Sequence, residues 1–136
     1  EEFIQPNPHL DSMLASIPLR KAVFTNADKE HARRVLDVLG VGHHFEWIVD
    51  VSDFGFNSKP HLSAYRRILD VLDARPDECI MVDDSVENLA PAKALGMLTV
   101  HVGNESSPEA PSRDGADVHI TDILDLADAI RPWILG

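Results

Sequence analysis

Apolar residues at helical spacing alternate along this chain with short runs of branched and aromatic residues. In residues 28–39, apolar side chains recur every three or four positions up to Gly40, which predicts an amphipathic helix that ends there. The stripe that follows Pro60 predicts another helix, since proline is tolerated in a first helical turn. On these patterns we expect helices at 9–16, 28–39, 60–74, 88–95 and 121–130, and strands at 21–25, 45–51, 78–84, 97–102 and 117–120.

Strands that alternate with helices of this length indicate βαβ units, in which a helix connects two parallel strands. We therefore predict an α/β fold, a three-layer Rossmann-like parallel sheet with helices on its faces. A chain of 136 residues suits one core, so residues 1–136 are expected to form a single domain. Pro91 is compatible with its helix if that helix begins near Asn88, where backbone N–H groups lack helical partners.

The composition limits the classes of function. Apolar residues make up 44% of the chain and charged residues 26%, as in globular proteins, and no run of 18 apolar residues could span a bilayer. The net charge of −11 argues against nonspecific binding to a nucleic-acid polymer, because its phosphates would meet few cations. A lone Cys79 and a first segment without a basic, then apolar, pattern predict a cytoplasmic protein.

Three polar clusters follow predicted strands, where parallel α/β sheets bind their ligands. Thr25 and Asn26 follow the first strand, Lys59 lies on the loop after the second, and Asp83 and Asp84 end the third. A hydroxyl, a helix N-terminus and an ammonium group suit a phosphate, whereas paired carboxylates suit Mg²⁺. Together they predict a site for phosphate and Mg²⁺ at one edge of the sheet.

Each cluster taken alone also has a plain structural interpretation. Thr25 and Asn26 could simply cap the following helix, Lys59 could be a surface residue, and the two aspartates could form a solvated turn. For Thr25 and Asn26 we expect both roles: they begin the helix, and the free N–H groups at its start cradle the phosphate.

The three clusters in this order resemble the haloacid dehalogenase superfamily of phosphohydrolases. The sequence "VFTNAD" is similar to its second motif, Lys59 in "NSKP" to its third, and "MVDDSVENLAPAKALGM" to its fourth. Residues 19–40, followed by "FEWIVDV" and "SKPHLSAY", look most like the pyrimidine 5′-nucleotidase branch. The resemblance implies a haloacid-dehalogenase-like core and Mg²⁺-dependent hydrolysis of a small phosphate monoester, with a pyrimidine nucleoside 5′-monophosphate as one candidate substrate.

The resemblance also implies a role for each residue that binds the phosphoryl group. Thr25 would donate its hydroxyl to that group, with the backbone N–H of Asn26 beside it. Lys59 would bridge the nucleophile and a phosphate oxygen, and so balance charge as the transition state develops. Catalysis of this kind is positioning plus electrostatic stabilisation.

The metal site follows from the fourth motif. Asp84 would hold Mg²⁺, with Asp83 assisting directly or through water. Asn88 stands where many family members have a second carboxylate, so it is expected, with Ser85, to orient the site rather than to bind the metal.

The first motif of the superfamily, D-x-D-x-T/V, supplies the attacking aspartate and has no match in the chain. In the family it precedes the "VFTN" segment, with a helical cap between, and only 22 residues precede Val23. The chain therefore looks like the C-terminal part of a phosphatase. We expect it to lack activity by itself, and to bind Mg²⁺ weakly because few protein ligands remain.

The strand that carries this motif lies mid-sheet in the family, between the strands that end at Thr25 and Asp84. Without it, both neighbours would leave N–H and C=O groups unpaired. We expect one of three outcomes: the two strands pair directly, another chain donates a strand, or a homodimer forms across the exposed edges. A lone chain with an open central slot is disfavoured.

Two further hypotheses remain. The competitor to the enzyme is a noncatalytic α/β module, derived from the same fold, that dimerises or binds a partner. His43 and His44 form an adjacent pair, but no metal site is expected there, because neighbouring side chains usually point apart and no acidic or Cys partner is evident.

Overall fold

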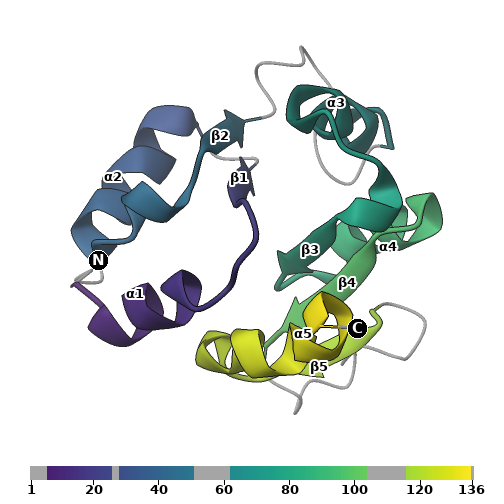
Figure 1. Cartoon of the computed structure of the whole chain (residues 1–136). Coiled ribbons are helices and arrows are strands. Elements are labelled where there is room, and N and C mark those ends of the chain that lie inside the picture. The colour runs from purple at the N-terminus through teal and green to yellow at the C-terminus, as the bar shows by residue number, and fades with distance from the viewer. Residues whose placement is uncertain (1–5, 26–27, 51–61, 104–115, 136) are drawn as a thin grey trace.

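The computed structural model describes residues 6–25, 28–50, 62–103 and 116–135. Helices and parallel strands alternate along the chain, as the hydrophobic pattern predicts (Figure 1). The α-helices are α1 (Pro8–Ala15), α2 (Lys29–Leu39), α3 (Leu62–Leu72), α4 (Val86–Leu95) and α5 (Leu126–Leu135); the strands are β1 (Ala22–Thr25), β2 (Trp47–Asp50), β3 (Ile80–Asp83), β4 (Leu98–Val102) and β5 (Val118–Ile120). Short 3₁₀ turns are η1 (Gly42–His44), η3 (Pro76–Glu78) and η4 (Ile123–Asp125).

Local sequence signals explain where the helices begin and end. Asn7 caps α1 by accepting the N–H of Leu10 on its side chain at 3.0 Å. Helices α2 and α4 both end at a glycine in the left-handed region, Gly40 at φ 80° and Gly96 at φ 109°, a conformation that side chains disfavour.

Two helix starts differ from the prediction. Helix α4 begins at Val86 behind a Ser85 cap rather than near Asn88, so Pro91 lies inside the helix, and the explanation offered for Pro91 is wrong. The backbone nitrogen of Pro91 has no hydrogen and so cannot donate a hydrogen bond to the preceding turn of the helix. The final helix was expected from residue 121, but η4 comes first and α5 begins only at Leu126.

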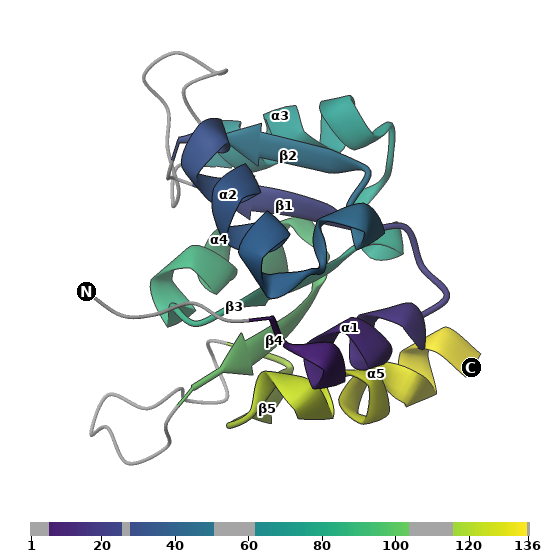
Figure 2. The same ribbon diagram turned by 90° about the vertical axis from the view of Figure 1, so that its left-hand side faces the viewer.

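All the strand pairs among the described residues are parallel, which confirms the α/β prediction. Strand β1 pairs with β2, and β3, β4 and β5 pair in that order. The arrows of β1, β2 and β4 run the same way in Figure 2, so the carboxyl ends of the strands lie towards one edge. In both sheets, strands that are neighbours in space also follow one another along the chain.

The sheet is interrupted between β1 and β3. In the described residues these strands do not pair, so the expectation that they close the gap directly is wrong. A cleft of about 840 Å³ lies there, and apolar side chains of α1, β1 and β3 line it, among them Leu14, Val23, Phe24, Met81 and Val82. The lone chain thus has the open slot that the sequence argument disfavours. A donated strand and a homodimer stay predictions.

Two hydrophobic clusters flank the cleft. One, formed by Met13, Leu14, Ile17, Val41, Val100, Ile120, Leu126 and Ile130, packs α1 and α5 together against the β3–β5 sheet. Figure 2 shows α1 lying beside α5. The other consists of Ala64, Tyr65, Leu69, Ala92 and Met97, at the contact between α3 and α4.

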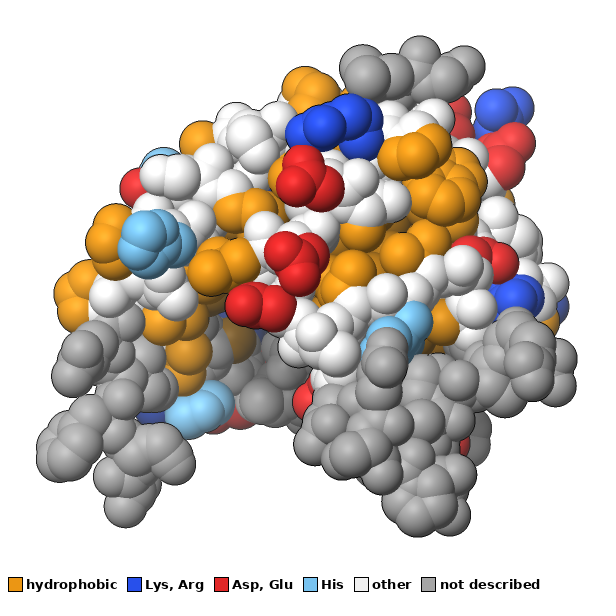
Figure 3. Space-filling model, turned by 90° about the horizontal axis from the view of Figure 1, so that it is seen from below, with side chains coloured by type: hydrophobic (Ala, Val, Ile, Leu, Met, Phe, Trp, Pro, Cys, Tyr) orange, Lys and Arg blue, Asp and Glu red, His pale blue; other side chains and the backbone are white. Residues whose placement is uncertain are grey.

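Part of the apolar surface stays exposed. Hydrophobic side chains spread over the face seen in Figure 3, between separate acidic groups. Exposed apolar residues of the described segments include Val38, Val71 and Trp133. None of the helices in these segments has the length and apolarity that a bilayer crossing requires.

Candidate functional site

Polar side chains stand at the carboxyl ends of β1, β2 and β3. Thr25 ends β1 and is half-buried, and Asp50 lies opposite it at the end of β2. Asp83 ends β3 and is half-buried as well. This is the edge at which parallel α/β sheets bind ligands.

The carboxylate of Asp83 is held by the turn that leads into α4. Its Oδ1 accepts the backbone N–H of Ser85 at 2.9 Å, and the Asn88 side-chain nitrogen lies 3.4 and 3.5 Å from its two oxygens. Ser85 caps the helix in turn, since its Oγ accepts the N–H of Asn88 at 3.3 Å. Asp83 therefore presents a carboxylate whose direction is fixed by its own chain.

Tyr65 connects this turn to β1. Its side chain is fully buried, its hydroxyl donates to the Asn88 carbonyl at 2.5 Å, and its ring meets Phe24 of β1 edge-on at 5.4 Å. Burial raises the pKa of Tyr65, and the nearby charge of Asp83 raises that pKa further. Tyr65 is thus a neutral hydrogen-bond donor that spans the two sides of the cleft, a role that the sequence interpretation missed.

The start of α2 differs from the expectation. Asp28 is the N-cap, with its Oδ1 accepting the N–H of Glu30 at 2.8 Å. Asp50, only 5% exposed, accepts the N–H of Lys29 at 2.7 Å. The positive end of α2 therefore already faces two carboxylates of the chain.

Two parts of the expectation for this helix are thereby corrected. Thr25 and Asn26 do not begin α2, and the N–H groups of Lys29 and Glu30 are not free to cradle a phosphate. The sequence offered one signal for Asp50, because it is a polar residue that ends a strand, as Thr25 and Asp83 are.

The remaining predicted residues divide into two groups. Asp84 is exposed, directly after β3. Asn26 and Lys59 lie outside the described residues, so their phosphate-binding roles stay predictions.

Asp83 and Asp84 supply the kind of oxygen ligand that Mg²⁺ prefers. In the described part of the chain, however, they do not belong to any cluster of three or more close Asp, Glu, His or Cys side chains. The carboxylate oxygens of Asp83 and Asp84 thus fit Mg²⁺. The other ligands of the metal ion would have to come from water, phosphate or another strand.

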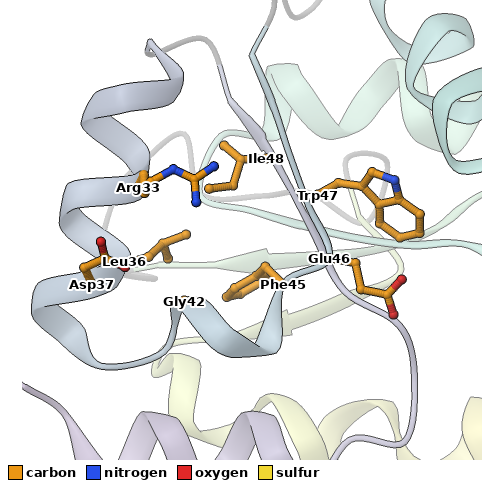
Figure 4. Close-up of a pocket in the computed structure, with 8 residues that line it drawn as sticks. All are labelled: Arg33, Leu36, Asp37, Gly42, Phe45, Glu46, Trp47 and Ile48. Atoms are coloured by element: carbon orange, nitrogen blue, oxygen red, sulfur yellow. The ribbon is translucent and has the colours of Figure 1, made fainter.

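The small pocket drawn in Figure 4 is a different feature. It has a volume of about 150 Å³ and lies between α2 and the beginning of β2, with Arg33, Phe45 and Trp47 among its lining residues. It adjoins the amino end of β2 and is therefore at the other end of the strand from Asp50.

A cluster of possible metal ligands also lies away from the strand ends. Nε2 of His44 and Nε2 of His43 lie 2.6 and 3.3 Å from the same oxygen of Asp11 in α1. The expectation that the histidine pair has no acidic partner is therefore wrong. Asp11 was missed because it is 33 residues from His44 in the sequence.

Comparison with known proteins decides the family. The profile of the haloacid dehalogenase-like hydrolases matches residues 2–96. The chain belongs to this family. The assignment agrees with the resemblance seen in the second, third and fourth motifs.

Curated relatives include phosphatases. The chain is 26% identical over 133 residues to the glyceraldehyde 3-phosphate phosphatase of Methanocaldococcus jannaschii, covering 95% of this chain and 58% of that protein. It is 33% identical over 117 residues to the phosphoglycolate phosphatase of Rhodospirillum rubrum, covering 85% and 47% respectively. It is also 36% identical over 103 residues to the bifunctional epoxide hydrolase 2 of Mus musculus, covering 68% of this chain and 18% of that protein. The chain thus spans less than two thirds of each relative.

Solved structures show the same fold. A haloacid dehalogenase-like protein of unknown function from Agrobacterium tumefaciens superimposes with a TM-score of 0.77 at 22% identity, over 90% of this chain and 59% of that one. A phosphatase of the family from Thermococcus onnurineus gives 0.72 at 24% identity, over 95% and 55%. The chain therefore has the same fold as these two structures over most of its length.

Proposed function

We propose that this chain forms part of a Mg²⁺-dependent phosphatase that hydrolyses a small phosphate monoester. The observation that carries the proposal is the Asp83 carboxylate, fixed by Ser85 and Asn88 at the end of β3, on the same edge as Thr25. Family membership and the phosphatases among the relatives support it.

In this proposal each residue has one task. Thr25 donates a hydrogen bond to the phosphoryl group, with the Asn26 N–H beside it, and Lys59 balances the charge that develops on the phosphate oxygens. Asp84 and Asp83 hold the metal ion, which would neutralise phosphate charge when bound.

Asn88 and Ser85 act on the Asp83 carboxylate rather than on the substrate. Because the Asn88 amide approaches both carboxylate oxygens, it limits rotation of the Asp83 side chain. Tyr65 supports the same turn by binding the Asn88 carbonyl. These contacts reduce the conformational freedom that metal binding would otherwise have to remove.

The attacking carboxylate would come from a further strand in the cleft between β1 and β3. A parallel strand there would pair with both edges, cover apolar side chains such as Val23 and Val82, and end between Thr25 and Asp83. We therefore propose that the 136 residues alone are inactive, and that the strand comes from an adjoining segment or from another chain.

The substrate is proposed to be small and the protein cytoplasmic. A pyrimidine nucleoside 5′-monophosphate is the candidate favoured by residues 19–40 and the segments after them. The names of two relatives point instead to phosphorylated two- and three-carbon compounds.

The test measures Mg²⁺-dependent release of inorganic phosphate from UMP, CMP, phosphoglycolate and glyceraldehyde 3-phosphate. Both the 136-residue chain and the complete product of its gene are assayed, each also as Asp84→Asn. We expect turnover by the complete product alone, reduced at least about 100-fold by the substitution, because charge stabilisation is lost.

Turnover by the 136-residue chain would contradict the proposed source of the nucleophile. No turnover by either form, with no Mg²⁺-dependent binding of inorganic phosphate in calorimetry, would refute the phosphatase.

The open slot favours one second candidate, a noncatalytic module that forms a homodimer through the edges of β1 and β3. Sedimentation of the 136-residue chain distinguishes the two. A stable dimer without phosphate binding supports the module, whereas a monomer that binds Mg²⁺ and phosphate together supports the enzyme.

A further inference from the structure

We propose that Asp11, His43 and His44 form a binding site for Zn²⁺ or a similar transition-metal ion, separate from the Mg²⁺ site. One ligand atom of each residue lies within 4.8 Å of the other two. Two imidazoles and a carboxylate are the ligand types that Zn²⁺ favours, and three protein ligands leave the fourth position for water.

The backbone brings these side chains together from two distant segments. Asp11 is in the first turn of α1, whereas His43 and His44 are in η1, between α2 and β2. The N–H of Asn7 donates to the Leu39 carbonyl at 3.1 Å, which fixes the start of α1 near the end of α2. The site therefore lies where two backbone segments already meet.

The rings of His43 and His44 are turned towards the same carboxylate oxygen. Successive residues of a 3₁₀ turn point about 120° apart. Here the ring centroids of His43 and His44 are nevertheless 4.1 Å apart, with an angle of 37° between the planes. Both rings direct Nε2 towards Oδ1 of Asp11.

The distances suit a metal after a small adjustment. Tetrahedral Zn²⁺ with bonds of about 2.0–2.1 Å places its ligand atoms about 3.3–3.5 Å apart. Nε2 of His43 is already 3.3 Å from Oδ1 of Asp11. Nε2 of His44 is 2.6 Å away, a hydrogen-bonding distance that would lengthen by less than about 1 Å as the metal replaces the proton.

Accessibility and charge both favour entry of a cation. The His43 and Asp11 side chains are 66% and 45% exposed, while His44 is 11% exposed and anchors the cluster. The net charge of −11 attracts cations to the protein generally. The site precedes β2 and so lies at the amino end of that strand, away from Asp83.

The simpler alternative is that Asp11 only joins the two imidazoles by hydrogen bonds and ion pairing. Metal binding separates these interpretations. The test uses the tag-free chain, titrated by calorimetry with Zn²⁺ and by visible absorption with Co²⁺, with His43→Ala and Asp11→Asn as variants. His31→Ala, an exposed histidine on α2, is the matched control.

We expect one equivalent of Zn²⁺ to bind, a rise in the unfolding temperature with the metal, and Co²⁺ absorption typical of four-coordination. Each of the two variants should weaken binding at least tenfold, and the control should not. His43 is exposed, so His43→Ala should leave the unfolding temperature of the metal-free chain nearly unchanged. A chain that binds no Zn²⁺, or that binds it equally well in both variants, overturns the proposal.

Discussion

Tyr65 gives the sharpest test of how the two sides of the cleft are held. The change is Tyr65→Phe, which removes the hydroxyl bound to the Asn88 carbonyl and keeps the ring that contacts Phe24. One buried hydrogen bond contributes a net ~1 kcal/mol to the free energy of unfolding. For a chain of 136 residues, that loss lowers the unfolding temperature by about 4 °C.

The dependence on pH makes the test specific. Burial raises the pKa of Tyr65 above that of an exposed tyrosine, and Asp83 adds to the shift, so the folded chain keeps the phenol protonated where the unfolded chain ionises. The stability linked to this group is present below about pH 10 and is lost as the pH rises towards the folded-state pKa. The wild-type chain should therefore lose stability above about pH 10, and Tyr65→Phe should lose less over the same range.

The assay is urea unfolding at about pH 8 and about pH 11, together with alkaline titration followed by tyrosinate absorbance. The chain contains one tyrosine, so the absorbance reports Tyr65 alone. Tyrosinate should appear only as the chain unfolds. Trp133→Phe, at an exposed aromatic position, should change stability by less than about 0.5 kcal/mol.

Two results would refute this account of Tyr65. One is a reversible titration near the ordinary tyrosine pKa while the fold stays intact. The other is an unchanged urea midpoint in Tyr65→Phe, which would mean that the hydroxyl contributes nothing at its observed 2.5 Å contact.

Two further substitutions test the ends of the strands. Asp50→Ala should lower the free energy of unfolding by ~1–2 kcal/mol, because it removes the acceptor of the Lys29 N–H at the positive end of α2; an unchanged urea midpoint would exclude that role. Burial would raise the pKa of Asp117, but hydrogen bonds from Thr99 and the Lys93 ammonium outweigh it and the pKa is lowered. The linked stability is present above the ordinary aspartate pKa and lost as the pH falls below it, so Asp117→Asn should show a smaller loss between about pH 5 and pH 3 in acid unfolding.

The local features of the fold could be predicted from the sequence because each rests on a local signal. Branched runs such as "AVF" and "IMV" mark β1 and β3, and Gly40 and Gly96 mark the ends of α2 and α4. The polar residues that end the strands gave the candidate site at Thr25 and Asp83. These signals depend on neighbours within a few positions, so one sequence contains them.

The features that were missed depend on distant segments. Asp11 meets His44 from 33 positions away, and Tyr65 meets the carbonyl of Asn88 from 23 positions away. Asp50 reaches the amide of Lys29 from 21 positions away. Only the packing of α1, α2 and α3 onto the strands brings these groups together, and no local pattern records it. The sequence predicts that a strand is missing between β1 and β3. It does not predict that these two strands stay unpaired in the described residues, because direct pairing was one of the outcomes expected.

The order of the strands also bears on how the chain folds. Because β1 is beside β2, and β3, β4 and β5 are in sequence order, each sheet forms from contacts that are comparatively close along the chain. These pairings close shorter loops than the docking of α1 on α5 does, so they cost less chain entropy. We therefore expect the β1–β2 and β3–β5 sheets to open separately once α1 leaves α5, and native-state hydrogen exchange should then resolve two levels of protection where a continuous sheet would give one.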